Sequence, residues 1–147
     1  MFIYNKIVKI LIVNGPNLNF LQKREKIYSN ISFKKLKKEL LNYSKKYFKL
    51  IFFNSNCEGK IVNFLQKNYK IDWLIINPAS FSHYSLSILD CLKIFKGTII
   101  EVHITNLYKR EYFRNKSLIS LNSNIIISGM KYNGYYNAIN YIYDLCY

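Results

Sequence analysis

The amino-acid sequence predicts a three-layer α/β domain built on a five-stranded, parallel, doubly wound sheet. Short runs rich in β-branched and aromatic residues alternate with longer runs of helical period, and no low-complexity linker separates them. Most of the short runs are continuously apolar, as expected for strands that are covered on both faces of a sheet. The length of 147 residues suits a single domain, residues 1–147, and is too short for two comfortable ones.

The predicted strands are apolar runs bounded by polar or turn-forming residues. Their ranges are 7–13 (IVKILIV), 48–54 (FKLIFFN), 72–77 (DWLIIN), 98–103 (TIIEVH) and 124–128 (NIIIS). The first run lies within the apolar stretch MFIYNKIVKILIVNG, which has some likeness to a signal peptide. Because Lys6 and Lys9 interrupt that stretch and no small-residue cleavage site follows, we favour a strand there.

An amphipathic helix is predicted between the first two strands. Its apolar positions recur at spacings of three and four, at Phe33, Leu36, Leu40, Tyr43 and Tyr47. Lysines at 34, 35, 37, 38, 45 and 46 fill the opposite face, and Ser32 is a plausible N-cap. A lysine-rich helix face usually points to solvent, and we favour that interpretation over a nucleic-acid footprint.

Three further helices are predicted from similar patterns. They span 58–69 (with Ile61, Phe64 and Leu65), 83–95 (with Leu86, Leu89, Asp90 and Lys93) and 135–146 (with Ala138, Tyr141, Ile142 and Leu145). Strands that alternate with helices in this way are typical of a flavodoxin-like fold, in which helices cover both faces of a parallel sheet.

The charge balance is strongly basic. Lys and Arg number 22 against 8 Asp and Glu, a formal net charge of +14, which taken alone indicates a nucleic-acid or anionic-membrane partner. The cations are nearly all lysine, with arginine only at 24, 110 and 114, and the chain is crowded with Asn, Ile, Tyr and Phe. Drift toward AT-rich codons would produce that bias, so we expect neither a nucleic-acid nor a membrane partner.

The cysteines and the uncharged stretches indicate the compartment. Cys57, Cys91 and Cys146 are odd in number, widely spaced and without a C-x-x-C pair, so free thiols are expected and neither a disulfide framework nor a zinc site is indicated. The longest uncharged stretch, 73–89, contains Asn77 and His83 and does not predict a membrane span. We expect a soluble, cytoplasmic protein.

The rare residue types gather after the predicted strands. Both prolines, both histidines and all three arginines fall just past a strand end or in the loop that follows. In a doubly wound sheet the ligand crevice lies at the carboxyl ends of the strands, where the strand order reverses, here between strands one and three. The residues expected to converge there include Asn17, Arg24, Tyr28, Asn77, His83, Glu101, His103 and Arg114.

These residue types offer acid–base groups, amide donors and cations. Two histidines without a nearby trio of carboxylates predict no metal site, and the chain lacks a G-x-S-x-G elbow and both of the common glycine-rich phosphate-binding loops. Acid–base catalysis on a small polar anion fits best. The alternatives are a flavodoxin-like enzyme that acts on another small carboxylate and a basic nucleic-acid-binding module.

Seven segments resemble type II 3-dehydroquinate dehydratase, in that family's order and with similar spacing. The match covers essentially the whole chain, and N-G-P-N-L, I-N-P-A and E-V-H-I-T-N make a highly specific combination. The segments are 15–19, 24–28, 55–59, 76–79 with 82–85, 101–106, 110–114 and 134–135.

The resemblance implies an anti elimination of water from 3-dehydroquinate to 3-dehydroshikimate through an enolate, without Schiff base, metal or cofactor. Tyr28 would be the general base, with Arg24 favouring its anion. Asn17 would stabilise the enolate oxygen. His103 would protonate the departing hydroxyl, and Glu101 would hold its ring in the productive tautomer.

The resemblance also implies a substrate-binding set and an assembly. Asn77 and the backbone amides of Ile104 and Thr105 would grip the substrate carboxylate, and His83 and Arg114 would hold the ring hydroxyls. Asp90 would reach the site of a neighbouring subunit in a homododecamer, a tetramer of trimers. Arg110 is expected to brace the loop or an interface, and Glu58 to support the site from behind.

The sequence departs from the family pattern in the lid loop and beside His83. The family usually has one more residue between the catalytic arginine and tyrosine, and a glycine where Ser29 follows Tyr28 here. These changes bear on lid closure and on the reach of Tyr28. Tyr84 occupies a position where a small threonine is usual.

Overall fold

A computed structural model describes residues 7–23 and 31–147 and contains one five-stranded, all-parallel sheet in the order β2-β1-β3-β4-β5. The strand order reverses between β1 and β3, as predicted, so a crevice is expected at their carboxyl ends. The bounds of the strands are β1 Val8–Asn14, β2 Phe48–Asn54, β3 Trp73–Asn77, β4 Thr98–His103 and β5 Ile125–Ser128.

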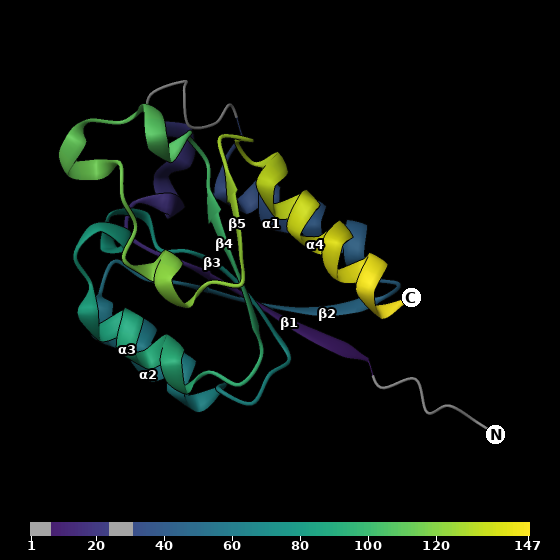
Figure 1. Cartoon of the computed structure of the whole chain (residues 1–147). Helices are drawn as coiled ribbons and strands as arrows, with labels where there is room; N and C mark the ends of the chain where they lie inside the picture. Colours follow the sequence, from purple (N-terminus) through teal and green to yellow (C-terminus); the bar gives the residue numbers. More distant parts are fainter. Residues whose placement is uncertain (1–6, 24–30) are drawn as a thin grey trace.

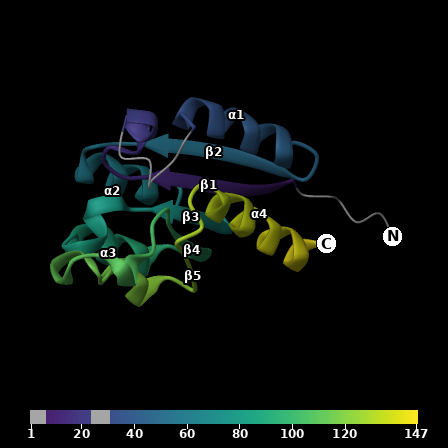
Figure 2. The ribbon, with the colours of Figure 1, turned by 90° about the horizontal axis from the view of Figure 1, so that it is seen from above.

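Two pairs of helices cover the two faces of the sheet (Figures 1 and 2). Helices α1 (Phe33–Ser44) and α4 (Asn133–Cys146) pack on one face, and α2 (Glu58–Lys67) and α3 (Leu86–Ile94) on the other. The predicted three-layer α/β class is therefore confirmed.

Strand β1 shows why the predicted strands are continuously apolar. Successive side chains of a strand point to opposite faces, and here Leu11 and Val13 join the core beneath α2 and α3, while Ile10 and Ile12 join the core beneath α1 and α4. All four are fully buried. Each such side chain contributes roughly 1.5–3 kcal/mol of burial free energy, which fixes the central strand and the loop that follows it.

Helix α1 begins where the sequence predicts and ends earlier. Ser32 is the N-cap, and its Oγ accepts a hydrogen bond from the backbone N–H of Lys35. The helix ends at Ser44, whose Oγ donates to the carbonyl of Leu40, and the chain turns directly into β2. The lysines at 34, 35, 37, 38, 45 and 46 are all exposed.

Helix α3 begins at Leu86 and not at His83, because Ser85 caps it. The Oγ of Ser85 accepts from the N–H of Ile88 at 3.0 Å, and residues Ala79–His83 form a separate 3-10 turn, η2. The correction matters for function because it places His83 in the loop after β3, with its side chain directed by that turn.

Two expectations about helix faces are wrong. In α4 the buried stripe is Tyr135, Ala138, Ile139 and Ile142, whereas Tyr141 and Leu145 are exposed. In α1 Tyr43 is also exposed. Its hydroxyl donates to Oδ1 of Asn140 at 2.5 Å and its ring packs edge-on against Tyr136, so it links α1 to α4 at the surface.

The ends of β1 and β3 are held against one another by a close backbone contact at Gly15. Its N–H donates to the carbonyl of Asn77 at 2.8 Å, and a Cβ at this position would lie 2.2 Å from the carbonyl oxygen of Pro78. Only glycine permits this approach.

In the described residues no helix is long and apolar enough to cross a bilayer.

Candidate active site

A pocket lies at the carboxyl ends of β1, β3 and β4, where the topology predicts one. Its volume is about 450 Å³, and it is open to solvent. Its wall combines apolar side chains with amide, imidazole and guanidinium groups. The lining residues are Leu18, Asn77, Ala79, Ser80, His83, Ile104, Arg110 and Arg114.

Asn17 lies in the turn after β1. Its backbone has a φ of 65°, in the left-handed region that asparagine tolerates better than most residues. Its N–H donates to Oδ1 of Asn56, in the loop after β2, at 2.9 Å. The turn residue expected here is therefore tied to the neighbouring strand end, and its side chain is exposed.

Asn77 belongs to a buried polar chain beneath the pocket. The Tyr135 hydroxyl donates to Oδ1 of Asn14 at 2.6 Å and accepts from Nδ2 of Asn77 at 3.2 Å, while Oδ1 of Asn77 accepts from the N–H of Ala79. Burial raises the pKa of Tyr135, so its hydroxyl stays protonated and serves as a donor. An amide group carries two hydrogens, so donation of one to Tyr135 leaves the other for a ligand.

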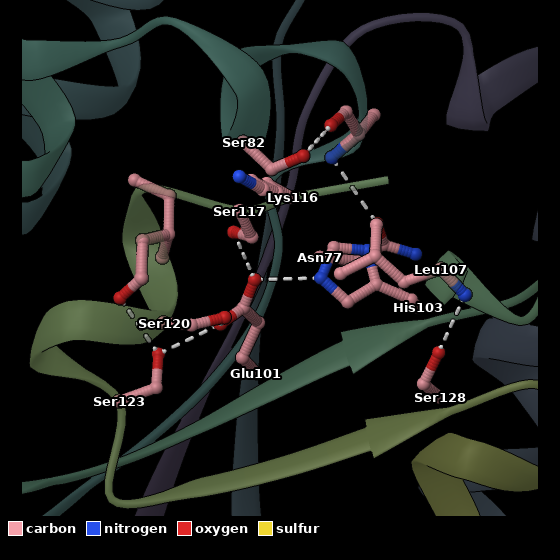
Figure 3. A network of polar contacts seen from close by, with 12 residues as sticks. Asn77, Ser82, Glu101, His103, Leu107, Lys116, Ser117, Ser120, Ser123 and Ser128 are labelled. Carbon is pink, nitrogen blue, oxygen red and sulfur yellow. Dashed lines mark hydrogen bonds and ion pairs between the residues drawn. The ribbon is translucent and has the colours of Figure 1, made fainter. Parts of the chain in front are cut away.

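Glu101 and His103 form a buried pair at the end of β4 (Figure 3). His103 Nε2 lies 2.6 Å from Oε1 of Glu101. Because a carboxylate only accepts, Nε2 carries the hydrogen and Nδ1 is the free nitrogen of the ring. The predicted pairing is thus present, and it fixes which ring nitrogen faces the carboxylate.

Hydroxyl groups complete the surroundings of Glu101. Ser117 donates to Oε1 at 2.5 Å, and Ser120 and Ser123 donate to Oε2 at 2.7 and 3.1 Å (Figure 3). Burial by itself raises the pKa of Glu101, but the hydrogen bonds and the charge of His103 outweigh it and hold the pKa below its usual value. The carboxylate is therefore ionised at neutral pH.

His83 follows β3 and faces the pocket. Its Nδ1 lies 2.7 Å from the carbonyl oxygen of Lys116, so Nδ1 carries the hydrogen and Nε2 is left as an acceptor. Burial lowers the pKa of His83, and the positive charges of Arg110, His103 and Arg114 act in the same direction. His83 is accordingly a neutral hydrogen-bond acceptor at neutral pH.

Two arginines bring positive charge to the pocket wall. Nε and Nη2 of Arg110 donate to Oγ1 of Thr105 at 3.0 and 2.7 Å, so Arg110 braces the loop after β4. Arg114 donates to Glu111 at 2.6 Å through Nη2, and these hydrogen bonds lower the pKa of the exposed Glu111 carboxyl. Both guanidinium groups remain in the pocket lining.

The structure brings most of the predicted site together and leaves some residues apart. Ile104 lines the pocket and Thr105 follows it, whereas Asp90 lies exposed on α3 and pairs with Lys93 at 2.7 Å. Tyr28 and Arg24 lie outside the described residues. Glu58 accepts a short hydrogen bond from Ser85, which supports the loop that carries His83.

The sequence reasoning missed the serines around Glu101 and the role of Tyr135. Serine is frequent in this chain, so Ser117, Ser120 and Ser123 carried no rare-residue signal. Their spacing of three was the available sign, because in a 3-10 helix it repeats a hydroxyl on one side; Ser120 lies in the short helix η5 (Ile119–Asn122), and Ser117 and Ser123 flank it. Tyr135 belonged to a motif, but nothing in the sequence indicated its partners.

Within residues 7–23 and 31–147, no group of three or more His, Cys, Asp or Glu side chains is arranged to hold a metal ion.

Comparison with known proteins identifies close relatives. A 3-dehydroquinate dehydratase of Clostridium botulinum (strain Hall) is 43% identical over 136 residues, which cover 90% of this chain and 92% of that protein. A 3-dehydroquinate dehydratase of Bartonella bacilliformis is 42% identical over 136 residues, covering 90% of this chain and 86% of that protein.

Solved structures match over the same extent. The type II dehydroquinase from Butyrivibrio crossotus superposes with a TM-score of 0.89 at 39% identity, over 93% of this chain and 98% of that one. The type II dehydroquinase from Propionibacterium acnes gives a TM-score of 0.87 at 31% identity, over 91% and 94%. The family model described as dehydroquinase class II matches residues 8–143. The chain therefore belongs to the class II dehydroquinase family.

Proposed function

We propose that this chain is a 3-dehydroquinate dehydratase, a hydro-lyase of the shikimate pathway, and that residues 1–147 make up one catalytic domain. The reaction is the anti elimination of water from 3-dehydroquinate to give 3-dehydroshikimate through an enolate. The observation that carries the proposal is the buried Glu101–His103 pair at the end of β4, next to a pocket lined by Asn77 and two arginines. Family membership supplies the substrate.

His103 is proposed as the general acid for the departing hydroxyl. The ionised Glu101 holds Nε2–H in place, so a proton carried at Nδ1 can be passed to a leaving oxygen. The pair is buried, which strengthens the electrostatic interaction between carboxylate and imidazole.

The groups around the pocket are proposed to bind the substrate. The remaining amide hydrogen of Asn77 and the backbone amides of Ile104 and Thr105 would bind the carboxylate, because all of them are donors at the ends of β3 and β4. The neutral His83 would accept a ring hydroxyl through Nε2, and Arg114 would contact another. These roles match the polarity of each group.

The base and its assistants are proposed from the sequence motif. Tyr28 would remove the proton alpha to the ketone as a tyrosinate, with Arg24 lowering the pKa of its hydroxyl. Asn17 would stabilise the enolate oxygen. This role is supported by the position of its turn, which lies at the end of β1 beside the loop of Asn77. No metal or organic cofactor takes part in the proposed reaction.

We further propose that the enzyme works in the cytoplasm as a homododecamer, a tetramer of trimers. Tyr84, Tyr108, Tyr112 and Phe113 expose 60–83% of their surface in the loops near the pocket. Exposed aromatic groups of this size favour association. Asp90 is proposed to reach the pocket of a neighbouring subunit, in keeping with its exposed position on α3.

The test is a direct assay. Purified protein is mixed with 3-dehydroquinate, and the ultraviolet absorbance of the conjugated enone product is followed. We expect turnover without added metal or cofactor. An absence of product in freshly purified, folded protein would contradict the proposal and would favour an enzyme of another small carboxylate.

A second measurement tests the reaction course. Borohydride is added during turnover, because it reduces and traps a Schiff base between a lysine and a ketone. We expect full activity to survive the treatment. Inactivation that depends on the presence of substrate would contradict a direct enolate mechanism.

A further inference from the structure

The segment 116–123 contacts His83 directly and His103 through Glu101. The carbonyl oxygen of Lys116 accepts from Nδ1 of His83, and the next residue, Ser117, donates to the carboxylate that holds His103. The segment is itself anchored, since the N–H of Leu118 donates to the carbonyl of Ser82 at 2.7 Å. It therefore supports both His83 and Glu101, and Figure 3 shows Lys116 and Ser117 close to the Glu101–His103 pair.

Three hydroxyls of this segment surround Glu101, and we refer to Ser117, Ser120 and Ser123 as the serine cradle. Oε1 of Glu101 accepts from Ser117 and from His103, whereas Oε2 accepts from Ser120 and Ser123. A carboxylate has about four acceptor positions, so the four donors saturate it. The two donors on Oε2 prevent the group from rotating, which keeps Oε1 directed at His103.

We infer that the serine cradle is a positioning device for the acid–base pair, with Ser117 and Ser120 as its principal positioning residues. This rests on the proposed function and adds residues to it. Hydroxyls satisfy a buried anion without adding positive charge, so the full charge of Glu101 acts on His103. A lysine or arginine in the same place would share that charge and weaken the contact between Glu101 and His103.

The geometry ranks the three serines. Ser117 and Ser120 lie 2.5 and 2.7 Å from the carboxylate. Ser123 lies 3.1 Å from Oε2 and also 3.1 Å from the carbonyl of Ile119, so its single hydrogen is divided between two acceptors. Loss of Ser123 should therefore have the smallest effect.

Steady-state kinetics test the ranking. In Ser117→Ala and Ser120→Ala we expect kcat to fall by about tenfold to a hundredfold, the value of one hydrogen bond to a charged group, with KM within about twofold. In Ser123→Ala kcat should fall less. Ser120→Thr, which keeps a hydroxyl, should retain most of the activity. Ser44→Ala is the matched control, because Ser44 is also a buried serine, but its hydroxyl donates to the carbonyl of Leu40, within its own helix and away from Glu101.

The pH profile separates positioning from a purely structural role. The charged and titratable groups around Glu101 are His103 on β4 and, across the pocket, His83 with Arg110 and Arg114. Loss of a donor raises the pKa of Glu101, so the acid limb of kcat should move to higher pH in Ser120→Ala. The acid limb should stay in place in Ser44→Ala.

Nuclear magnetic resonance of the imidazole nitrogens gives a measurement that does not depend on turnover. In the unchanged protein the signals should report hydrogen on Nε2 of His103, and Ser120→Ala should broaden or shift them. If Ser117→Ala and Ser120→Ala fold, keep kcat and its acid limb, and leave these signals unchanged, the inference is wrong. If the unchanged protein lacks dehydratase activity but the signals respond as expected, the proposed function fails and the positioning role stands.

Discussion

At the scale of single residues, the site depends on how each titratable group is held. Glu101 and His103 are both almost fully buried, and their hydrogen bonds determine which nitrogen carries a hydrogen. His83 is held in the opposite way, through Nδ1, which leaves Nε2 as an acceptor. His83 lines the pocket and His103 is buried at the end of β4 next to it, so the two imidazoles of the described site offer different nitrogens.

Replacement of the proposed acid should abolish catalysis and spare the fold. We expect His103→Ala to lower kcat by about a hundredfold to ten-thousandfold, the usual contribution of a general acid, while circular dichroism stays unchanged. Tyr28→Phe should have a similar effect as loss of the base. Near-normal turnover in either variant would overturn the role assigned to that residue.

The ionisation of Glu101 should appear in the acid stability of the protein. Its pKa is lower in the folded protein than in the unfolded chain, so its contribution is complete above the unfolded pKa of about 4.3 and is lost as pH falls through the folded value. Urea titrations of the unchanged protein and Glu101→Gln should differ by about 3–5 kcal/mol near neutrality, and the difference should shrink below about pH 4.

A constant difference across that pH range would contradict this prediction. Glu111→Gln is the matched control, because that carboxyl is exposed and its loss should leave stability nearly unchanged at every pH.

At the scale of elements, the sequence predicts the strands almost residue by residue. Each strand lies within one residue of its predicted range, because buried parallel strands form unbroken apolar runs. Helix ends are less predictable, since they depend on side-chain bonds such as those of Ser44 and Ser85. The exposure of Tyr141 and Leu145 also depends on how α4 is rotated on the sheet, which its own sequence does not determine.

The site was predictable in outline only. Rare residues and the position of the switch point indicate Asn77, His83, Glu101 and His103, because three of them lie at the carboxyl ends of β3 and β4 and His83 lies in the loop after β3. The serine cradle and the Tyr135 chain were not predictable, since they join loops far apart in the sequence, and their donors are common residue types.

The contact between the ends of β1 and β3 should be intolerant of a methyl group. In Gly15→Ala the new Cβ would lie 2.2 Å from the carbonyl oxygen of Pro78. Because that oxygen belongs to the backbone, it cannot move aside without displacing the loop. We expect a loss of about 1–3 kcal/mol, as for overpacking, together with a raised KM because Asn77 adjoins the displaced loop. Thermal unfolding and steady-state kinetics measure the two effects.

Gly59→Ala is the control for that substitution. Gly59 lies in α2, and a methyl group at this position would point into open space. The change should therefore stabilise the helix by about 0.5–1 kcal/mol. Equal destabilisation by both substitutions would refute the role given to the Gly15 contact.

At the scale of the whole molecule, the prediction concerns assembly. Sedimentation should give a mass near twelve times that of one chain if the proposed homododecamer forms, and a monomer in dilute solution would contradict it.

Asp90→Ala should raise KM, whereas Ser87→Ala, at a nearby exposed position, should not, because only Asp90 is proposed to enter a neighbouring pocket. An unchanged KM in Asp90→Ala would remove that residue from the site.

The lysines on the outer face of α1 have a consequence for the kinetics of encounter. With a formal charge of +14, the chain attracts a small anion over distances comparable with the Debye length, about 10 Å at 0.1 M salt. That attraction speeds arrival, but it does not select one anion over another. Added salt should therefore slow capture and raise KM while kcat holds steady, since the acid–base pair lies buried beyond the reach of the ions that screen the surface.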